Sequence, residues 1–401
     1  MYLNRESLEN HIIFSILFAI MFYIQIYAGY YSDNPMSTQF IRNFFRIFQY
    51  IVVIFILVFY FLKKIKINKK QIFMIGACFI FTIIPIVNSS SKNISGVLSF
   101  LMLIAFFLSD NEIHRKTFNY SKKIWAIFSL IGIICFVSYL LKFPIPYLEH
   151  PYYFSAFEDG ELVRSYINFK FCFLYKEREI IRLCGICNEP GFWGTISALF
   201  LCVDNINLKK KENLIIFIAG CLTSSVAFFI LLILYLFLFS LKNIKLFILV
   251  SVGAVVCLSV LSNISTGNET IDLFLRRIQF SNGKLIGDNR SNSIADSLLK
   301  DTINNRPIWG FGEGYTSSKT TGILTYKSYI INYGVVGFIL MYGSLFLSAI
   351  YTYWKKNLEI IIYPLIFFIS IYQRPNIFNL PYIILLFGGL AYIYNNKLNN
   401  L

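Results

Sequence analysis

The residues Arg182-Leu-Cys-Gly-Ile-Cys-Asn-Glu-Pro-Gly-Phe-Trp-Gly194 end a polar loop and open a long apolar segment. Polar loops followed by long apolar segments recur along the 401-residue chain. Of its residues, 57% are hydrophobic and only 14% are charged. A soluble protein has about 25% charged residues. Apolar runs of roughly 16–21 residues match helices that cross a hydrocarbon core ~30 Å thick. We therefore predict an all-α polytopic integral membrane protein with about twelve transmembrane helices and two large extracytoplasmic loops.

The apolar runs give the expected helix positions. The run after residue 213 is flanked by lysines at both ends, which requires an even number of crossings, so we divide it at Thr223-Ser-Ser225 into two short helices. The predicted helices cover about 12–31, 44–62, 72–87, 94–108, 124–141, 190–208, 214–222, 226–241, 246–261, 328–353, 360–372 and 378–394.

The formal net charge of +15 is placed mostly in short loops between apolar runs. That placement follows the positive-inside rule, in which lysine and arginine anchor cytoplasmic loops. It puts both termini in the cytoplasm and argues against a nucleic-acid-binding surface. The clusters are Lys63, Lys64, Lys66, Lys69 and Lys70; Arg115, Lys116, Lys122 and Lys123; Lys209 to Lys211; and Lys355 and Lys356.

The first large loop, residues 142–189, is polar, aromatic and mixed in charge. Most of its ion pairs are expected to be solvated surface pairs of little energetic value. Arg182 and Glu189 differ because they lie at the start of an apolar helix, where a charge near lipid is costly and usually functional. The Pro190-Gly191 pair after the glutamate predicts a sharp helix start that lets a ligand approach the backbone closely.

The second large loop, residues 263–327, contains an amphipathic pattern. Ile294 and Leu298, with Leu299 and Ile303, have helical spacing, which predicts a helix on the outer membrane surface with Arg290 at its start and Pro307 after its end. The glycines at 310, 312 and 314 then predict a flexible turn. No strand precedes this turn, which argues against a nucleotide-binding loop. Beside several arginines, the turn could still wrap an anionic headgroup.

The cysteines and histidines do not indicate a metal site. Cys184-x-x-Cys187 has metal or redox spacing, but no second pair or neighbouring histidine completes it, which leaves packing or a disulfide, with Cys172 as a further partner. The three histidines are scattered, and His150 alone lies in a predicted outer loop. Glu189 is therefore the better candidate for a general base, and we expect no metal and no cofactor.

The motifs around these residues resemble those of Wzy-type polysaccharide repeat-unit polymerases, within the O-antigen ligase/polymerase superfamily. The first is Arg182…Gly185-Ile-x-Asn188-Glu189-Pro190-Gly191 at the start of a helix, followed by Thr223-Ser-Ser225. The second is Arg290 with Pro307-x-x-Gly310-x-Gly312, followed by Tyr329-Ile-Ile-Asn-Tyr-Gly-Val-Val-Gly337. Ligases of the superfamily usually have a histidine before this last helix. Here Thr325-Tyr326-Lys327-Ser328 occupies that place, which favours a polymerase over a ligase.

The resemblance implies a metal-independent glycosyl transfer at the outer face of a bacterial inner membrane. Donor and acceptor would be glycans on undecaprenyl pyrophosphate, destined for O-antigen or capsule, with a chain-length regulator as a possible partner. The catalytic residues would be Glu189 and Arg290. The substrate-binding residues would be Arg182, Asn188, Arg276, Arg277, Gly310, Gly312 and Tyr326.

Two other kinds of protein share the polytopic pattern. A lipid-linked sugar flippase or other transporter predicts charges inside the helices and inverted repeats, and the sequence offers neither convincingly. A ligase lacks the expected histidine. Aromatic residues in the outer loops could stack on sugars, although membrane-interface anchoring is the commoner role, and we expect the same anchoring role for Arg374.

Overall fold

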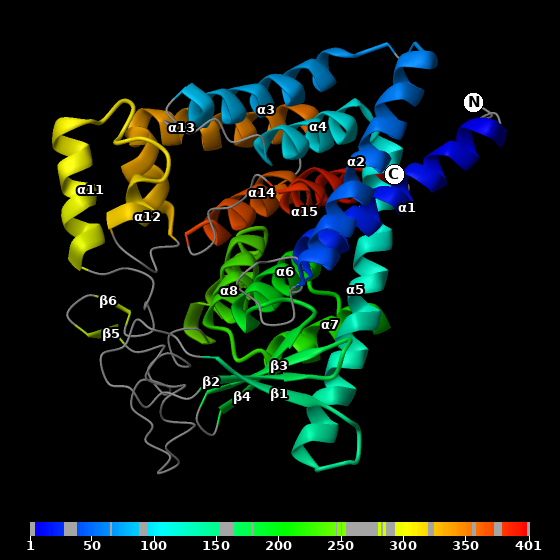
Figure 1. Cartoon of the computed structure of the whole chain (residues 1–401), viewed down its shortest axis with the longest axis vertical. Helices are drawn as coiled ribbons and strands as arrows, with labels where there is room; N and C mark the ends of the chain where they lie inside the picture. Colours follow the sequence, from blue (N-terminus) through cyan, green and yellow to red (C-terminus); the bar gives the residue numbers. More distant parts are fainter. Residues whose placement is uncertain are drawn as a thin grey trace. The chain divides into compact units, whose positions relative to one another are not determined.

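The chain is mostly helical (Figure 1). A computed structural model describes residues 5–27, 38–64, 66–87, 95–152, 164–177, 180–245, 247–249, 251–253, 280–281, 284–285, 293–319, 325–354, 358–372 and 379–398. Within these ranges, four helices are long and apolar enough to cross a membrane, judged by length and composition. They are Glu9–Ile26, Gln39–Leu62, Asn111–Leu140 and Tyr326–Tyr353.

The chain divides into two compact units, and the first comprises Met1–Lys122 and Arg290–Leu401. In it α13 packs along α3, α3 packs along α4, and α14 contacts both α13 and α16 (Figure 1). Its described helices are α1 (Arg5–Ile26), α2 (Gln39–Leu62), α3 (Lys69–Val87), α4 (Ser95–Leu108), the first part of α5 (Asn111–Leu140), α11 (Ser293–Asn305), α12 (Tyr315–Lys319), α13 (Tyr326–Tyr353), α14 (Leu358–Ser370), α15 (Leu380–Ile383), the π-helical segment η2 (Ile384–Gly388) and α16 (Gly389–Leu398).

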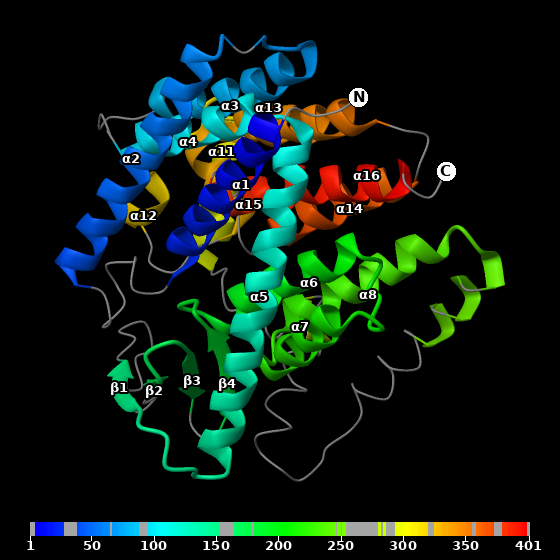
Figure 2. The ribbon, with the colours of Figure 1, turned by 90° about the vertical axis from the view of Figure 1, so that its right-hand side faces the viewer.

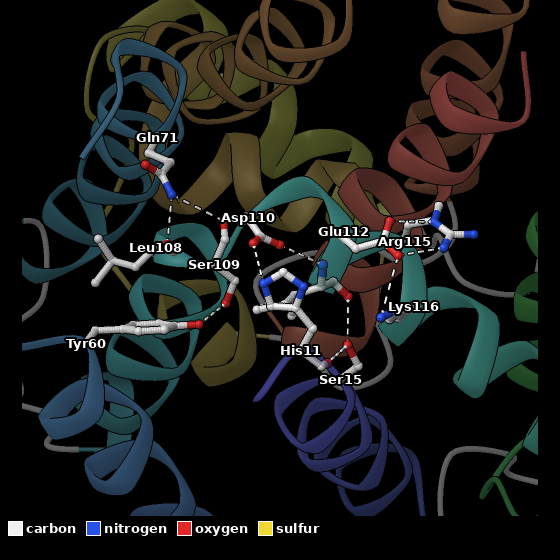
Figure 3. A network of polar contacts seen from close by, with 11 residues as sticks. His11, Ser15, Tyr60, Gln71, Leu108, Ser109, Asp110, Glu112, Arg115 and Lys116 are labelled. Carbon is white, nitrogen blue, oxygen red and sulfur yellow. Dashed lines mark hydrogen bonds and ion pairs between the residues drawn. The ribbon is translucent and has the colours of Figure 1, made fainter. Parts of the chain in front are cut away.

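A polar network at the turn between α4 and α5 ties several helices of this unit together (Figure 3). Asp110 forms an ion pair of 2.8 Å with His11 Nε2 of α1. The hydroxyls of Ser109 and Tyr60 of α2 lie 2.6 Å apart, and Gln71 Nε2 of α3 donates to the Ser109 carbonyl at 3.2 Å. Buried polar groups are stabilising only when they are paired, so this network has a structural role in joining the helices.

The second unit, Lys123–Asn289, contains a sheet that the sequence analysis did not predict. Its strands are antiparallel and follow chain order: β1 (Leu148–Tyr152), β2 (Arg164–Asn168), β3 (Phe173–Glu177) and β4 (Ile180–Gly185). The described helices of the unit are the second part of α5, α6 (Pro190–Val203), α7 (Lys211–Leu222) and α8 (Val226–Ser240), and the two-residue strands β5 (Phe280–Ser281) and β6 (Lys284–Leu285) form a separate pair.

One face of the sheet packs on the second part of α5 (Figure 2). Ile167, Leu174 and Leu183 come from three neighbouring strands and join Cys135 and Phe136 of the helix in one buried cluster. Residues 142–189 were predicted to form a polar loop, and the structure instead places the four strands β1 to β4 in this segment. The four strands have only five or six residues each, and their apolar and polar residues do not alternate, so composition alone did not distinguish them from a loop.

The predicted division of the apolar run at Thr223–Ser225 is confirmed, because α7 ends at Leu222 and α8 begins at Val226. The helices around this turn are short. The lengths of α6, α7 and α8 are 14, 12 and 15 residues. At 1.5 Å per residue each is about 18–23 Å long, less than a ~30 Å hydrocarbon core. The predicted helix over 246–261 lies largely outside the described residues.

The amphipathic helix of the second loop is present as α11, and it ends two residues before Pro307 as predicted. The side that it buries against the protein carries small residues. Ala295 and Thr302 are fully buried, whereas Ile294 and Ile303 are about half exposed. The helix turns this buried stripe toward α13 because small residues allow close packing there, and the larger isoleucines remain on the open side.

Candidate functional site

The turn from β4 into α6 places the residues that the sequence singled out. Gly185 has φ of +60°, and a Cβ there would lie 2.3 Å from the Trp193 ring, so the position accepts glycine alone. Glu189 is the N-cap of α6, with extended backbone, and Pro190 occupies the first turn. Proline suits this position because its missing N–H would have no helical partner.

We call the face of the sheet opposite α5 the Arg182 face. A row of four side chains crosses this face. Strand register pairs His150 with Tyr166, Tyr166 with Tyr175, and Tyr175 with Arg182. Directly paired residues point to the same side of an antiparallel sheet. The rings of Tyr166 and Tyr175 meet edge to face with centroids 5.6 Å apart. From His150 to Arg182 the row spans three strand spacings, about 14 Å.

The Asn188–Glu189 segment lies over this row. The Tyr166 hydroxyl donates to the Asn188 carbonyl at 2.7 Å, which fixes the segment above the second member of the row. The Glu189 side chain makes no capping bond to α6, although a carboxylate at an N-cap commonly does so. Its carboxylate therefore does not cap α6.

Arg182 reaches from the sheet to the turn between α7 and α8. Its Nε donates to the Thr223 carbonyl at 2.9 Å, and its Nη2 donates to the Ser224 carbonyl at 3.3 Å. These carbonyls end α7, where a positive charge also interacts favourably with the helix dipole. The same turn packs on α6, because a Cβ on Gly194 would lie 2.8 Å from Ser225 Cβ. Strand β4, the start of α6 and the α7–α8 turn thus converge at the arginine.

The two cysteines between Arg182 and Glu189 serve as packing residues. Cys184 and Cys187 are both fully buried, and neither forms a disulfide. Burial raises the pKa of the Cys184 thiol well above its usual range, while the charge of Arg182 lowers it and that of Glu189 raises it, so both charges act at this thiol. In the part of the chain that the structure describes, no cluster of three or more metal-ligating side chains is present.

The second motif, residues 307–312, lies in the first unit and packs against an interruption in helix α13. Helix α13 is interrupted at Gly334, which has φ of +76°. The Phe311 and Gly312 N–H groups donate to the carbonyls of Ile331 and Asn332, both at 2.9 Å. A Cβ on Gly310 would lie 2.5 Å from the Gly334 nitrogen. The carbonyls of α13 that have no helical partner at the interruption thus accept hydrogen bonds from this segment. This arrangement favours a structural role for Gly310 and Gly312.

Tyr326 begins α13 and packs on the end of α14. Its N–H donates to the Tyr372 carbonyl at 3.4 Å, and the two rings have centroids 5.3 Å apart. Next to it, Lys327 Nζ forms an ion pair of 2.6 Å with Asp296 of α11. This end of α13 is therefore joined to two other helices of the unit.

The structure brings three of the predicted site residues together: Arg182, Asn188 and Glu189. Gly310, Gly312 and Tyr326 lie in the other unit, the two glycines against α13 and Tyr326 at its start. Arg276, Arg277, Arg290 and Arg374 lie outside the described residues.

Three members of the row on the Arg182 face were not predicted as site residues from the sequence: His150, Tyr166 and Tyr175. The imidazole Nε2 of His150 is buried and has no hydrogen-bond partner among the described residues. The available signal was the short runs of aromatic and β-branched residues within the segments 164–168, 173–177 and 180–185. Read as strands, these segments place the tyrosines opposite Arg182.

Arg182→Lys is expected to lower the free energy of unfolding by about 1.5–3 kcal/mol, because a lysine ammonium cannot reproduce the fork that bridges two carbonyls. Thermal unfolding of the purified protein in detergent measures this change. Arg306→Lys, at an exposed side chain over the Phe311 ring, is the matched control and should unfold close to wild type. Equal midpoints for all three proteins would show that the carbonyl bridge contributes nothing.

In comparisons with known proteins, the chain matches no protein-family model, no curated protein and no solved structure.

Proposed function

We propose that this protein is a Wzy-type polymerase that joins oligosaccharide repeat units carried on undecaprenyl pyrophosphate into a surface polysaccharide. One observation carries the proposal: the Thr223–Ser225 turn, about forty residues further along the chain, meets Arg182 in the second unit, beside the Asn188–Glu189 segment. They belong to the first of the two motifs on which the resemblance to that family rests. The membrane-length apolar helices support a lipid-linked substrate.

In the proposed reaction, a hydroxyl oxygen of the acceptor repeat unit attacks the anomeric carbon of the donor glycan. A new glycosidic bond forms, and the bond from that carbon to the pyrophosphate oxygen breaks with its electron pair. Glu189 takes the hydroxyl proton, and undecaprenyl pyrophosphate leaves. Arg182 stabilises the charge that develops on the leaving group. Its guanidinium is already held by two backbone carbonyls, so little reorganisation is needed when the substrate binds.

The remaining predicted residues complete this proposal. Arg290, Arg276 and Arg277 are further candidates for contact with pyrophosphate oxygens, since a guanidinium makes paired, charge-assisted bonds to them. Asn188 orients the acceptor. Gly310 and Gly312 support the second outer loop, and Tyr326 is a candidate sugar contact. The reaction needs no metal or cofactor.

The proposal includes a topology. About twelve helices would cross a bacterial cytoplasmic membrane, both termini would be cytoplasmic, and the two large loops would face outward. In that orientation Ile294 and Ile303, which are half exposed on α11, would face the membrane surface. A chain-length regulator is a candidate partner.

Deleting the gene in its host and separating the surface glycan on a gel tests the proposal. A polymerase predicts glycan of a single repeat unit, still attached to its final acceptor, with a full ladder restored by the wild-type gene. Loss of nearly all surface glycan, including single units, would identify a flippase instead. Free lipid-linked polymer would identify a ligase, and an unchanged ladder would exclude all three roles.

A further inference from the structure

Two cysteines from different elements meet in the core of the second unit. Cys135 belongs to α5, and Cys172 lies in the turn between β2 and β3. Both belong to the buried cluster between helix and sheet, where Cys172 is fully buried and Cys135 is 8% exposed. Helix and sheet approach closely near this pair, because Leu183 of β4 lies 3.0 Å from where a Cβ on Gly132 of α5 would be.

Each thiol acts electrostatically on the other, and both side chains belong to the same buried cluster, so the two are neighbours there. The turn that carries Cys172 is closed by a hydrogen bond of 2.9 Å from the Phe169 N–H to the Cys172 carbonyl. A disulfide needs side chains that already approach each other, since the bond is short and tolerates little backbone movement. Here the approach is made by two rigid elements, a helix and a closed hairpin.

Three other described cysteines of the second unit differ from this pair. Cys184 and Cys187 belong to one continuous turn, and Cys187 N–H donates to the Cys184 carbonyl at 3.1 Å, so a bond between them would connect nothing new. Cys202 lies in α6, whose residues in that turn are all buried. A bond between Cys135 and Cys172 would instead fasten the sheet that carries Arg182 to α5.

We propose that Cys135 and Cys172 form a disulfide that fastens the sheet to α5 when the second unit folds in an oxidising compartment. The two thiols lose two protons and two electrons, and one sulfur–sulfur bond forms. A disulfide oxidant, either a thiol–disulfide oxidoreductase or a small disulfide such as oxidised glutathione, accepts these electrons and protons and is reduced to two thiols. The cross-link closes residues 136–171 into a loop and so restricts the unfolded chain. It does not depend on the proposed polymerase function.

Peptide mass spectrometry of the full chain tests the cross-link. The protein in detergent is incubated with oxidised glutathione, free thiols are alkylated under denaturing conditions, and the chain is cut with trypsin without reduction. Cleavage after Lys123, Lys142, Lys170 and Lys176 puts the two cysteines on peptides 124–142 and 171–176, while Cys184 and Cys187 fall on a peptide that begins at Leu183. We expect the first two peptides joined, and dithiothreitol should release them.

Cysteine variants distinguish the effect of the Cys135–Cys172 disulfide from other effects of the oxidant on stability. In wild type, dithiothreitol should lower the unfolding midpoint by about 2–4 °C. Cys135→Ala should lose both the joined peptide and this sensitivity, and Cys202→Ala should keep both. Full alkylation of Cys135 and Cys172 in wild-type protein after oxidation would overturn the proposal, as would a bond from Cys172 to Cys184. If the Cys135 variant does not fold, the wild-type peptide result decides alone.

Discussion

Glu189→Gln is expected to abolish the surface-glycan ladder and to lower the rate of repeat-unit transfer by about 10²–10⁴-fold. Glutamine has the shape of glutamate but cannot accept the hydroxyl proton at neutral pH. The glutamate side chain makes no capping bond to α6, so the helix start should be retained. The measurement is transfer between purified lipid-linked repeat units, with a gel of surface glycan from cells that contain equal amounts of protein.

Two variants make this result specific. Glu313→Gln changes an exposed carboxylate of the second loop and should leave the ladder intact. His150→Gln tests the other candidate proton acceptor, because its buried Nε2 lacks a hydrogen-bond partner among the described residues on the same sheet face. Normal transfer by the Glu189 variant, with transfer lost in the His150 variant, would move the base to His150. Normal transfer by both would exclude the Arg182 face as the catalytic site.

Gly334→Ala should lower the free energy of unfolding by about 3 kcal/mol or more. The position has φ of +76°, and an added Cβ would lie 2.5 Å from the carbonyl carbon and oxygen of Ile308. Those backbone atoms cannot move aside, because the Pro307 and Ile308 carbonyls accept hydrogen bonds from Val336 at 3.1 Å and Gly337 at 3.2 Å. The expected result is a strongly reduced yield and a lower thermal midpoint in detergent.

Gly343→Ala is the matched control in the same helix. A Cβ there would meet Ile339 at 4.0 Å, an ordinary contact, so alanine should be neutral or stabilising by up to about 1 kcal/mol. If Gly334→Ala were as stable as Gly343→Ala, the close contact between Gly334 and the Pro307–Ile308 backbone would not exist as described. Because this prediction concerns stability alone, it holds or fails independently of the proposed polymerase activity.

Helix starts and ends that depend on a short stretch of chain were predicted correctly from the sequence. The break between α7 and α8 at Thr223–Ser225 and the end of α11 before Pro307 follow from local charge and from the missing N–H of proline. The start of α6 at Pro190 does as well. The positions of most helices were likewise predicted from the apolar runs, because the tendency of a run to be buried depends on its own composition. The number that cross the membrane does not follow from those runs, since several are shorter than a hydrocarbon core.

The tertiary structure alone decided which distant residues meet. Strand pairing placed His150, Tyr166 and Tyr175 in one row with Arg182, and it turned a predicted loop into a sheet. Pairing depends on partners far along the chain, so short strands carry little signal of their own. The same holds for Cys135 and Cys172, and for the glycines that pack against α13. The stretch from Arg182 to Gly194 could be recognised by its local pattern, but its neighbours could be known only once the chain had folded.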